Sequence, residues 1–88
     1  MGEVLLKYRI MPDGPEVDLD ALQADLKAGM PAFASLQNCN AVPFAFGLKA
    51  LLTTVVVEDE EGNNDKLEDV LRAVEGVQGV ELVEMGRL

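Results

Sequence analysis

Apolar residues near the N-terminus recur at every second position, and this alternation restricts the fold more than any other feature of the sequence. Four of them share one side of an extended segment: Val4, Leu6, Tyr8 and Ile10. Charged side chains fall between them, at Glu3, Lys7 and Arg9. A period of two is typical of a strand with one buried face. We therefore predict a strand from Glu3 to Met11, ended by the turn-forming residues between Pro12 and Pro15.

A change to helical spacing follows and predicts a helix from about residue 18 to residue 29. Three leucines recur on one side of it: Leu19, Leu22 and Leu26. Asp18 is expected to cap the first free N–H groups, and Asp20 lies where the helix dipole favours an acid. Gly29 is expected to end this helix in a left-handed conformation.

A second apolar stripe at helical spacing predicts a helix from about Asp65 to Glu75. The stripe consists of Leu67, Val70, Leu71 and Val74. Asn63 or Asn64 is expected to cap its start and Gly76 its end. The acidic run Glu58–Glu61 precedes this helix. Because the run lacks the ligand spacing of a calcium loop, we interpret it as a solvated turn rather than a cation site.

Three further segments are predicted to be strands. The strongest is Leu48 to Glu58, where three consecutive valines make both faces apolar, as expected of a central strand. Phe33 to Asn40 has Leu36 as its only large aliphatic residue, which favours an edge position. Val80 to Met85 is the last predicted strand.

The order strand, helix, strand, strand, helix, strand is the βαββαβ pattern of a ferredoxin-like sandwich. We predict an α+β fold in which two helices cover one face of a four-stranded antiparallel sheet. The other face is then open to solvent or to a partner. The 88 residues leave room for a single domain, residues 1–88. This fold serves many functions, so the fold alone does not identify one.

Composition excludes several classes of partner. The net charge of −9 repels phosphate backbones and anionic membrane surfaces, so neither nucleic acid nor a membrane is expected as a partner. No stretch approaches the ~20 apolar residues that span a bilayer, and the N-terminus lacks the pattern of a signal peptide. The single cysteine, Cys39, forms no internal disulfide, which fits a cytoplasmic protein.

No residue pattern indicates catalysis or a bound metal. Histidine is absent, which excludes a Ser-His-Asp triad and a Cys/His zinc site. Cys39 has no neighbouring base in the sequence that would activate its thiol. Three methionines are interpreted as core filler: Met11, Met30 and Met85. We therefore expect no catalytic residue, no metal site and no cofactor.

The stretch from Pro43 to Leu51 is the remaining unusual feature. Pro43 cannot donate to a sheet ladder, and Gly47 permits backbone angles that other residues avoid. Phe44 and Phe46 are separated by one residue, so both point to the same face of an extended chain. From the residues alone, the favoured interpretation is a strand connection with two core aromatics. The alternative is a bend at Gly47 that turns one aromatic outward.

Taken in order, these residues resemble the signature of the elongation factor 1-beta family of the archaeal type. Residues 42–51 read VPFAFGLKAL, and a strand ending in VVVED follows at residues 55–59. The family signature is a Pro-x-x-Phe-Gly-x-Lys-x-Leu stretch that leads into a Val-Val-Glu-Asp strand end. The MP at residues 11–12 and the ending VEMGRL at residues 83–88 are also similar, so the resemblance covers nearly all of the chain.

The resemblance implies a guanine nucleotide exchange domain with a ferredoxin-like fold. Such a domain speeds GDP release from elongation factor 1-alpha, a GTPase, so that GTP reloads it during translation. The resemblance also implies that Phe46, beside Gly47, inserts into a hydrophobic pocket of that partner. Arg87 would take the place of a penultimate lysine that reaches the magnesium and phosphate site in eukaryotic members. We therefore expect these three residues to bind the partner, and the chain to be a monomer when free that catalyses no covalent chemistry.

Two alternatives remain open from the residues. A ferredoxin-like module that senses a small molecule or forms oligomers would use the open sheet face or an edge strand. An acylphosphatase-like enzyme would need an arginine in a phosphate loop after the first strand, but residues 11–15 include no basic residue. The sensing or oligomerising module predicts self-association, whereas an exchange factor predicts recovery of a GTPase.

Overall fold

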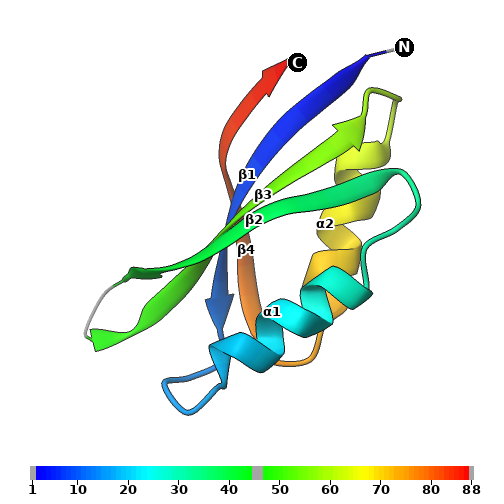
Figure 1. The fold of residues 1–88 in the computed structure, drawn as a ribbon. Coiled ribbons are helices and arrows are strands. Elements are labelled where there is room, and N and C mark those ends of the chain that lie inside the picture. The colour runs from blue at the N-terminus through cyan, green and yellow to red at the C-terminus, as the bar shows by residue number, and fades with distance from the viewer. Residues whose placement is uncertain (1, 45–46, 88) are drawn as a thin grey trace.

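The alternating residues near the N-terminus form strand β1 (Glu3–Pro12) in a computed structural model that describes residues 2–44 and 47–87 (Figure 1). The other elements follow in the predicted order: α1 (Leu19–Ala28), β2 (Ala34–Pro43), β3 (Lys49–Glu58), α2 (Asn63–Ala73) and β4 (Val77–Arg87). The predicted α+β class and the βαββαβ order of a ferredoxin-like fold are therefore confirmed.

Backbone pairing places the strands in the order β2-β3-β1-β4, and every neighbouring pair is antiparallel. The central position predicted for residues 48–58 and the edge position predicted for residues 33–40 are confirmed. Both edge strands are longer than predicted, because β2 pairs as far as Pro43 and β4 as far as Arg87. Backbone hydrogen bonds extend a strand along its neighbour without any alternation of apolar side chains, so the sequence pattern did not indicate these lengths.

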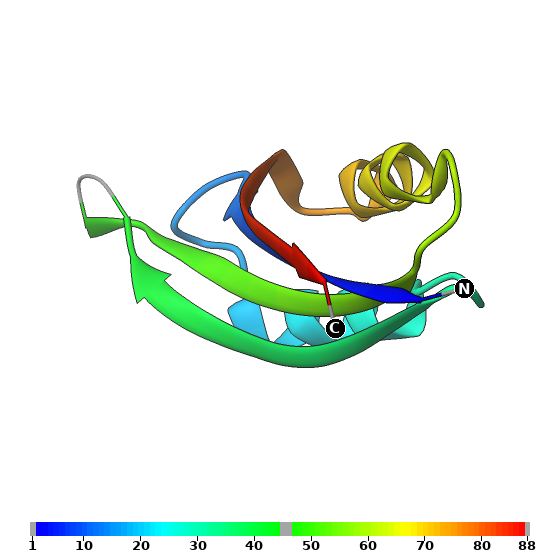
Figure 2. The same ribbon diagram turned by 90° about the horizontal axis from the view of Figure 1, so that it is seen from above.

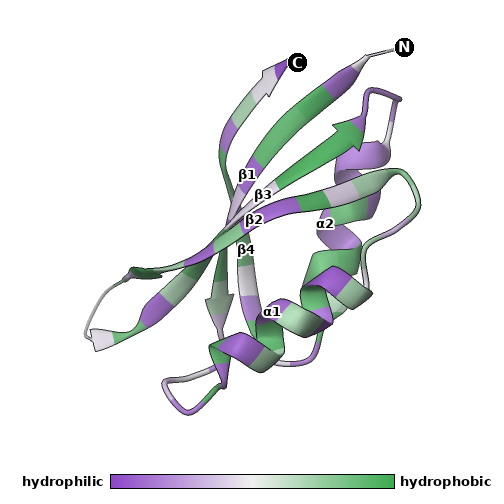
Figure 3. Ribbon diagram, viewed as in Figure 1, coloured by the Kyte–Doolittle hydropathy of each residue, from purple (hydrophilic) through white to green (hydrophobic). Residues whose placement is uncertain are grey.

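The core lies between one face of the sheet and the two helices. Alternate residues of β1 and β3 are buried in it together with two leucines from each helix. The buried cluster consists of Val4, Leu6, Tyr8, Ile10, Leu22, Leu26, Leu51, Val55, Val57, Leu67 and Leu71. Figure 3 shows hydrophobic stretches on the central strands β1 and β3, whereas the turn between β3 and α2 is hydrophilic. Both helices thus cover the same face, as predicted.

Two predictions about core residues are wrong. Phe44 is 40% exposed and lies just past the end of β2, outside the core cluster. Met85 is 59% exposed, because it lies on the edge strand β4, where Leu82 and Val83 are also exposed. A strand with a neighbour on only one side leaves more of its side chains uncovered.

Helix α1 begins as predicted and ends differently. The Asp18 carboxylate accepts hydrogen bonds from the backbone N–H groups of Asp20 at 3.0 Å and Ala21 at 3.3 Å. Gly29 has a φ of −87°, so the predicted left-handed cap is wrong. Its N–H still donates to the Asp25 carbonyl at 3.0 Å, which completes the last helical turn without any positive φ.

Helix α2 starts two residues earlier than predicted, and neither asparagine caps it. The N-cap is Gly62, whose φ of 85° lies in the left-handed region that glycine adopts easily. Asn63 is the first helical residue, is only 3% exposed, and donates from Nδ2 to the Glu58 carbonyl at 2.9 Å. At the other end Val74 is the cap, and Gly76, with a φ of 94°, follows outside the helix. The side chain of Asn63 thus ties the helix to the end of β3.

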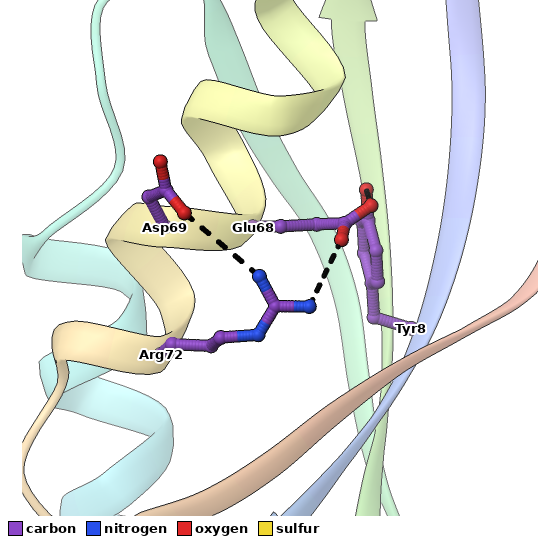
Figure 4. Close-up of polar contacts among 4 residues, drawn as sticks. All are labelled: Tyr8, Glu68, Asp69 and Arg72. Carbon is purple, nitrogen blue, oxygen red and sulfur yellow. Dashed lines mark hydrogen bonds and ion pairs between the residues drawn. The ribbon is translucent and has the colours of Figure 1, made fainter.

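One polar contact joins α2 to the sheet from within the core. The fully buried Tyr8 hydroxyl lies 3.5 Å from a carboxylate oxygen of Glu68 (Figure 4). The other oxygen of Glu68 accepts from Arg72 at 3.1 Å, and Arg72 also lies 3.8 Å from Asp69. Burial, and next the negative charge of Glu68, raise the pKa of the Tyr8 hydroxyl well above its usual range. Tyr8 is therefore held in its neutral form.

Candidate functional site

A backbone hydrogen bond joins the two sides of the connection between β2 and β3. The Phe44 N–H donates to the Leu48 carbonyl oxygen at 2.8 Å, just beyond the last strand pair of Pro43 and Lys49. Gly47 has a φ of 77°, so the unusual backbone angles expected there are present. Phe46 lies outside the described residues, and its predicted role stays a prediction.

The hairpin formed by β2 and β3 extends beyond the rest of the sheet (Figure 2). Pairing of β1 with β3 ends at Ile10 and Leu51, whereas β2 and β3 remain paired as far as Pro43 and Lys49. We call residues 42–44 and 47–50 the hairpin overhang. Gly47, one of the residues predicted to bind the partner, thus lies on a projecting end of the sheet.

A hollow of about 200 Å³ lies beside the hairpin overhang. The overhang contributes Gly47, Leu48 and Lys49 to its walls. The remaining walls come from the last residue of β1, the segment between β1 and α1, and the start of that helix: Pro12, Gly14, Pro15, Val17 and Leu19. Apart from Lys49 these residues are uncharged, and five of them have apolar side chains: Pro12, Pro15, Val17, Leu19 and Leu48.

Arg87 lies at the other end of the sheet, on the last residue of β4. Its side chain is 82% exposed, and its Nη1 donates to the Asp59 carboxylate at 3.0 Å. Asp59 directly follows β3, and its own N–H donates to the Gly2 carbonyl at 2.9 Å. An exposed ion pair of this kind is weak, so the guanidinium can exchange Asp59 for another acceptor.

A larger hollow of about 580 Å³ lies beside Arg87. It is bounded by the turn between β3 and α2, by the start of α2 and by the end of β4. Four carboxylates and one guanidinium line it: Asp59, Glu60, Glu61, Asp65 and Arg87. Its charge is therefore negative overall, which favours a cation or a basic protein surface over an anionic ligand.

The two candidate regions lie at opposite ends of the sheet (Figure 1). Gly47 comes just before β3 and Asp59 just after it, and β3 has 10 residues. At ~3.3 Å for each residue, such a strand is about 33 Å long. The longest extent of the molecule is 41 Å. The structure therefore does not bring Gly47 and Arg87 together, and a partner that contacts both must reach along the whole sheet.

Sequence reasoning missed two contacts at these ends. It did not predict the pair of Asp59 and Arg87, although Asp59 closes the VVVED stretch that was singled out, which was the available signal. It also did not predict that the Arg9 guanidinium lies over the ring of Phe44, with Cζ 5.3 Å from the ring centroid. No periodic pattern links residues so distant in the sequence.

Other reactive groups do not form a site. The half-buried Cys39 thiol lies 3.4 Å from the Thr53 hydroxyl, and burial raises its pKa although this hydrogen bond opposes the shift. In residues 2–44 and 47–87 no group of three or more His, Cys, Asp or Glu could hold a metal ion. The expectations of no metal and no cofactor stay predictions. No helix in this part of the chain is long and apolar enough to cross a membrane.

Comparison with known proteins decides the family. Residues 5–88 match the model of the EF-1 guanine nucleotide exchange domain. The chain belongs to this exchange domain family. It is 43% identical over 88 residues to elongation factor 1-beta of Halobacterium salinarum, with both chains covered completely. It is 45% identical over 87 residues to elongation factor 1-beta of Methanococcoides burtonii, covering 99% of this chain and 98% of that one.

Membership of the exchange domain family confirms the function expected from the signature. The chain has a nucleotide exchange role in translation elongation. An exchange role requires differential binding to two states of a partner and needs no covalent chemistry. Such a role needs a surface that binds the partner rather than an enclosed pocket with reactive groups.

Proposed function

We propose that the chain speeds GDP release from elongation factor 1-alpha by contacting this GTPase with both ends of its sheet. An exchange factor binds the nucleotide-free state better than the loaded state, and by linkage it weakens nucleotide binding equally. The observation that supports this proposal best is the separation of the hairpin overhang from the pair of Asp59 and Arg87 by the length of β3.

The energy needed favours two contacts over one. Weakening GDP binding a thousandfold requires ~4 kcal/mol of differential binding. Burying one phenylalanine, as proposed for Phe46, contributes about 1.5–3 kcal/mol. A second contribution is therefore needed, and the exposed guanidinium of Arg87 is well suited to supply it.

The proposed role of Phe46 is to bury its ring in an apolar pocket of the GTPase. Gly47 supports this role because its left-handed φ of 77° lets the chain reverse sharply directly after the aromatic residue. The apolar walls of the adjacent hollow of about 200 Å³ extend the surface that a partner would cover there.

The proposed role of Arg87 is to compete for the acidic groups that hold magnesium beside the phosphates of the bound nucleotide. Loss of the metal would leave the phosphate charge unneutralised and loosen GDP. Arg87 is 82% exposed, and its one ion pair among residues 2–44 and 47–87 is the surface pair with Asp59, so little is lost when it leaves that partner. Its planar guanidinium forms two parallel hydrogen bonds to a carboxylate more readily than an ammonium does.

The test is the rate of GDP release from elongation factor 1-alpha, measured by stopped flow over a range of concentrations of this chain. Phe46→Ala should raise the half-saturating concentration, because it removes binding area. Arg87→Ala should lower the maximal rate, because it removes the group that acts at the metal site. Lys27→Ala is the charge-matched control, since Lys27 is exposed in the last turn of α1, far from both ends.

Two results would contradict these roles. If Arg87→Ala reaches the wild-type maximal rate, the metal-site role is wrong. If Phe46→Ala leaves the half-saturating concentration unchanged, the anchor role is wrong.

We also propose that the free chain is a cytoplasmic monomer of one domain, residues 1–88. We propose further that it makes no direct contact with nucleic acid or a membrane, because its net charge of −9 repels their phosphate groups. Sedimentation equilibrium of the free chain tests the monomer.

A further inference from the structure

The hairpin overhang needs a contact that fixes its direction. Strand β1 runs beside β3 only as far as Leu51, so the residues beyond pair only with each other. Two strands without further neighbours are marginally stable in water. Ala50, at the base of the overhang, is fully buried, whereas a hollow of about 200 Å³ separates Gly47, Leu48 and Lys49 from the segment between β1 and α1.

Arg9 supplies a contact from the open face of the sheet. Its neighbours in β1, Tyr8 and Ile10, are buried in the core, so the side chain of Arg9 points away from the helices. There its guanidinium lies over the ring of Phe44, with Cζ 5.3 Å from the centroid. Its Nη2 also pairs with the carboxylate of Glu81, the residue opposite Arg9 on β4. One side chain thus links edge strand β4 to the residue that follows β2.

The surroundings of Arg9 partly remove its guanidinium from water. Its side chain is 35% exposed, and the Nε atom is buried without a hydrogen-bond partner among residues 2–44 and 47–87. Partial removal from water strengthens the attraction between a cation and an aromatic face. A planar group can stack on a ring while its edge meets a carboxylate, whereas a lysine ammonium is a point charge.

We propose that Arg9 is a positioning residue for nucleotide exchange. By holding Phe44, it fixes the start of the connection that leads along the chain to the proposed anchor residue Phe46. This inference rests on the proposed anchor role of Phe46. It predicts that loss of Arg9 affects partner binding even though Arg9 itself need not touch the partner.

Lys7 provides a matched control for Arg9. It lies on the same strand and the same face, its side chain is also 35% exposed, and its Nζ lies 3.9 Å from the carboxylate of Glu84 on β4. The structure records no aromatic ring beside Lys7 within the described residues. Arg9→Met and Lys7→Met therefore remove the same charge and a similar ion pair, and differ in the contact with Phe44.

Exchange kinetics should separate these two variants. Arg9→Met should raise the half-saturating concentration for GDP release roughly 3- to 10-fold and leave the maximal rate unchanged. Arg9→Lys should resemble Arg9→Met, because it keeps the charge and loses the plane. Lys7→Met should match wild type. Equal effects of Arg9→Met and Lys7→Met would overturn the proposal, since only charge would then matter.

Two further measurements distinguish a failure of this inference from a failure of the proposed function. The backbone N–H of Phe44 donates a hydrogen bond to the Leu48 carbonyl oxygen. Its hydrogen exchange should be faster in Arg9→Met than in Lys7→Met when the two variants have equal global stability. In a Phe46→Ala background, Arg9→Met should add no further loss of binding. An undiminished additional loss would overturn the positioning role. If Phe46→Ala alone has no effect, the anchor role is wrong, and the proposed positioning of Phe46 is wrong with it. The amide measurement still tests whether Arg9 holds Phe44 in place.

Discussion

The hairpin overhang and the end of β4 present different chemistry to a partner. The overhang carries Gly47 in a left-handed conformation, the exposed ring of Phe44, and one wall of a hollow whose residues are uncharged apart from Lys49. The other end carries the exposed guanidinium of Arg87 among four carboxylates. Apolar burial depends on shape and direction, whereas attraction between charges depends on distance and on ionic strength. The two ends should therefore respond to different perturbations, and the predictions below use that difference.

The largest expected difference between the two ends is the salt dependence of their variants in nucleotide exchange. We expect Phe46→Ala to raise the half-saturating concentration for exchange about 10- to 100-fold at low salt and at ~1 M salt alike, because an apolar contact is not screened. The loss of maximal rate in Arg87→Ala should shrink at ~1 M salt, where the Debye length is ~3 Å. GDP release titrated at both salt concentrations is the measurement. If both variants lose their effect together at high salt, both ends act through charge and the comparison is wrong.

Most of the fold could be predicted because period-two and helical apolar patterns report burial on one face. The same patterns explain the central position of Leu48 to Glu58 and the two helices. The exposure of Phe44 and Met85 could not be predicted, since it depends on which strands lie alongside them and not on their own hydrophobicity. The pair of Asp59 and Arg87 is likewise a consequence of sheet pairing.

Unfolding at alkaline pH tests the contact between the Tyr8 hydroxyl and Glu68, which joins the sheet to α2 between the two ends. The pKa of Tyr8 is raised in the fold above the ordinary value of 10.0, so the neutral hydroxyl contributes stability that is complete below pH 10. As the pH rises above 10, the unfolded chain loses its proton first. The free energy of unfolding should then fall by up to ~1.4 kcal/mol for each pH unit.

Denaturant unfolding of wild type and Tyr8→Phe at a series of alkaline pH values measures this slope. Tyr8→Phe should remove the tyrosine's share of this slope and leave the share of the Cys39 thiol, whose pKa burial also raises. The near-ultraviolet absorbance of the single tyrosinate reports the same titration directly. An unchanged slope in Tyr8→Phe would mean that the buried hydroxyl contributes nothing to the alkaline loss of stability.

Replacing one glycine at each end with alanine tests whether the backbone conformation matters more at the hairpin than at the end of β4. Gly47 has a φ of 77°, and no atom of the described residues lies within 4 Å of the point where its Cβ would lie. Gly86, beside Arg87, has the same open space among these residues but no left-handed φ. Gly47→Ala should lower the free energy of unfolding by about 1 kcal/mol from backbone strain alone. Gly86→Ala should change it by less than ~0.5 kcal/mol. Urea unfolding checks both, and equal losses would contradict a special role for backbone geometry at the hairpin.

The smallest expected effect concerns the pair of Asp59 and Arg87. Removing the acid by Asp59→Asn should change the free energy of unfolding by less than ~1 kcal/mol, because both side chains are exposed to solvent. It should also free the guanidinium, so that exchange at low salt improves by a factor of ~2–5. Stopped-flow GDP release at low and high salt is the measurement, and Asp59→Asn combined with Arg87→Ala should behave as Arg87→Ala alone.

Glu61→Gln is the control for that last variant. Glu61 lines the same hollow and carries the same charge, but the structure records no bond between it and Arg87 among the described residues. If only Asp59→Asn improves exchange, Arg87 is held by one specific partner and released on docking. If Glu61→Gln improves exchange equally, the summed negative charge of the acidic residues acts on the partner. The effect of Arg87 then comes from its charge alone and not from its pairing with Asp59. The charged end would in that case depend on composition, whereas the hairpin end depends on the placement of single residues.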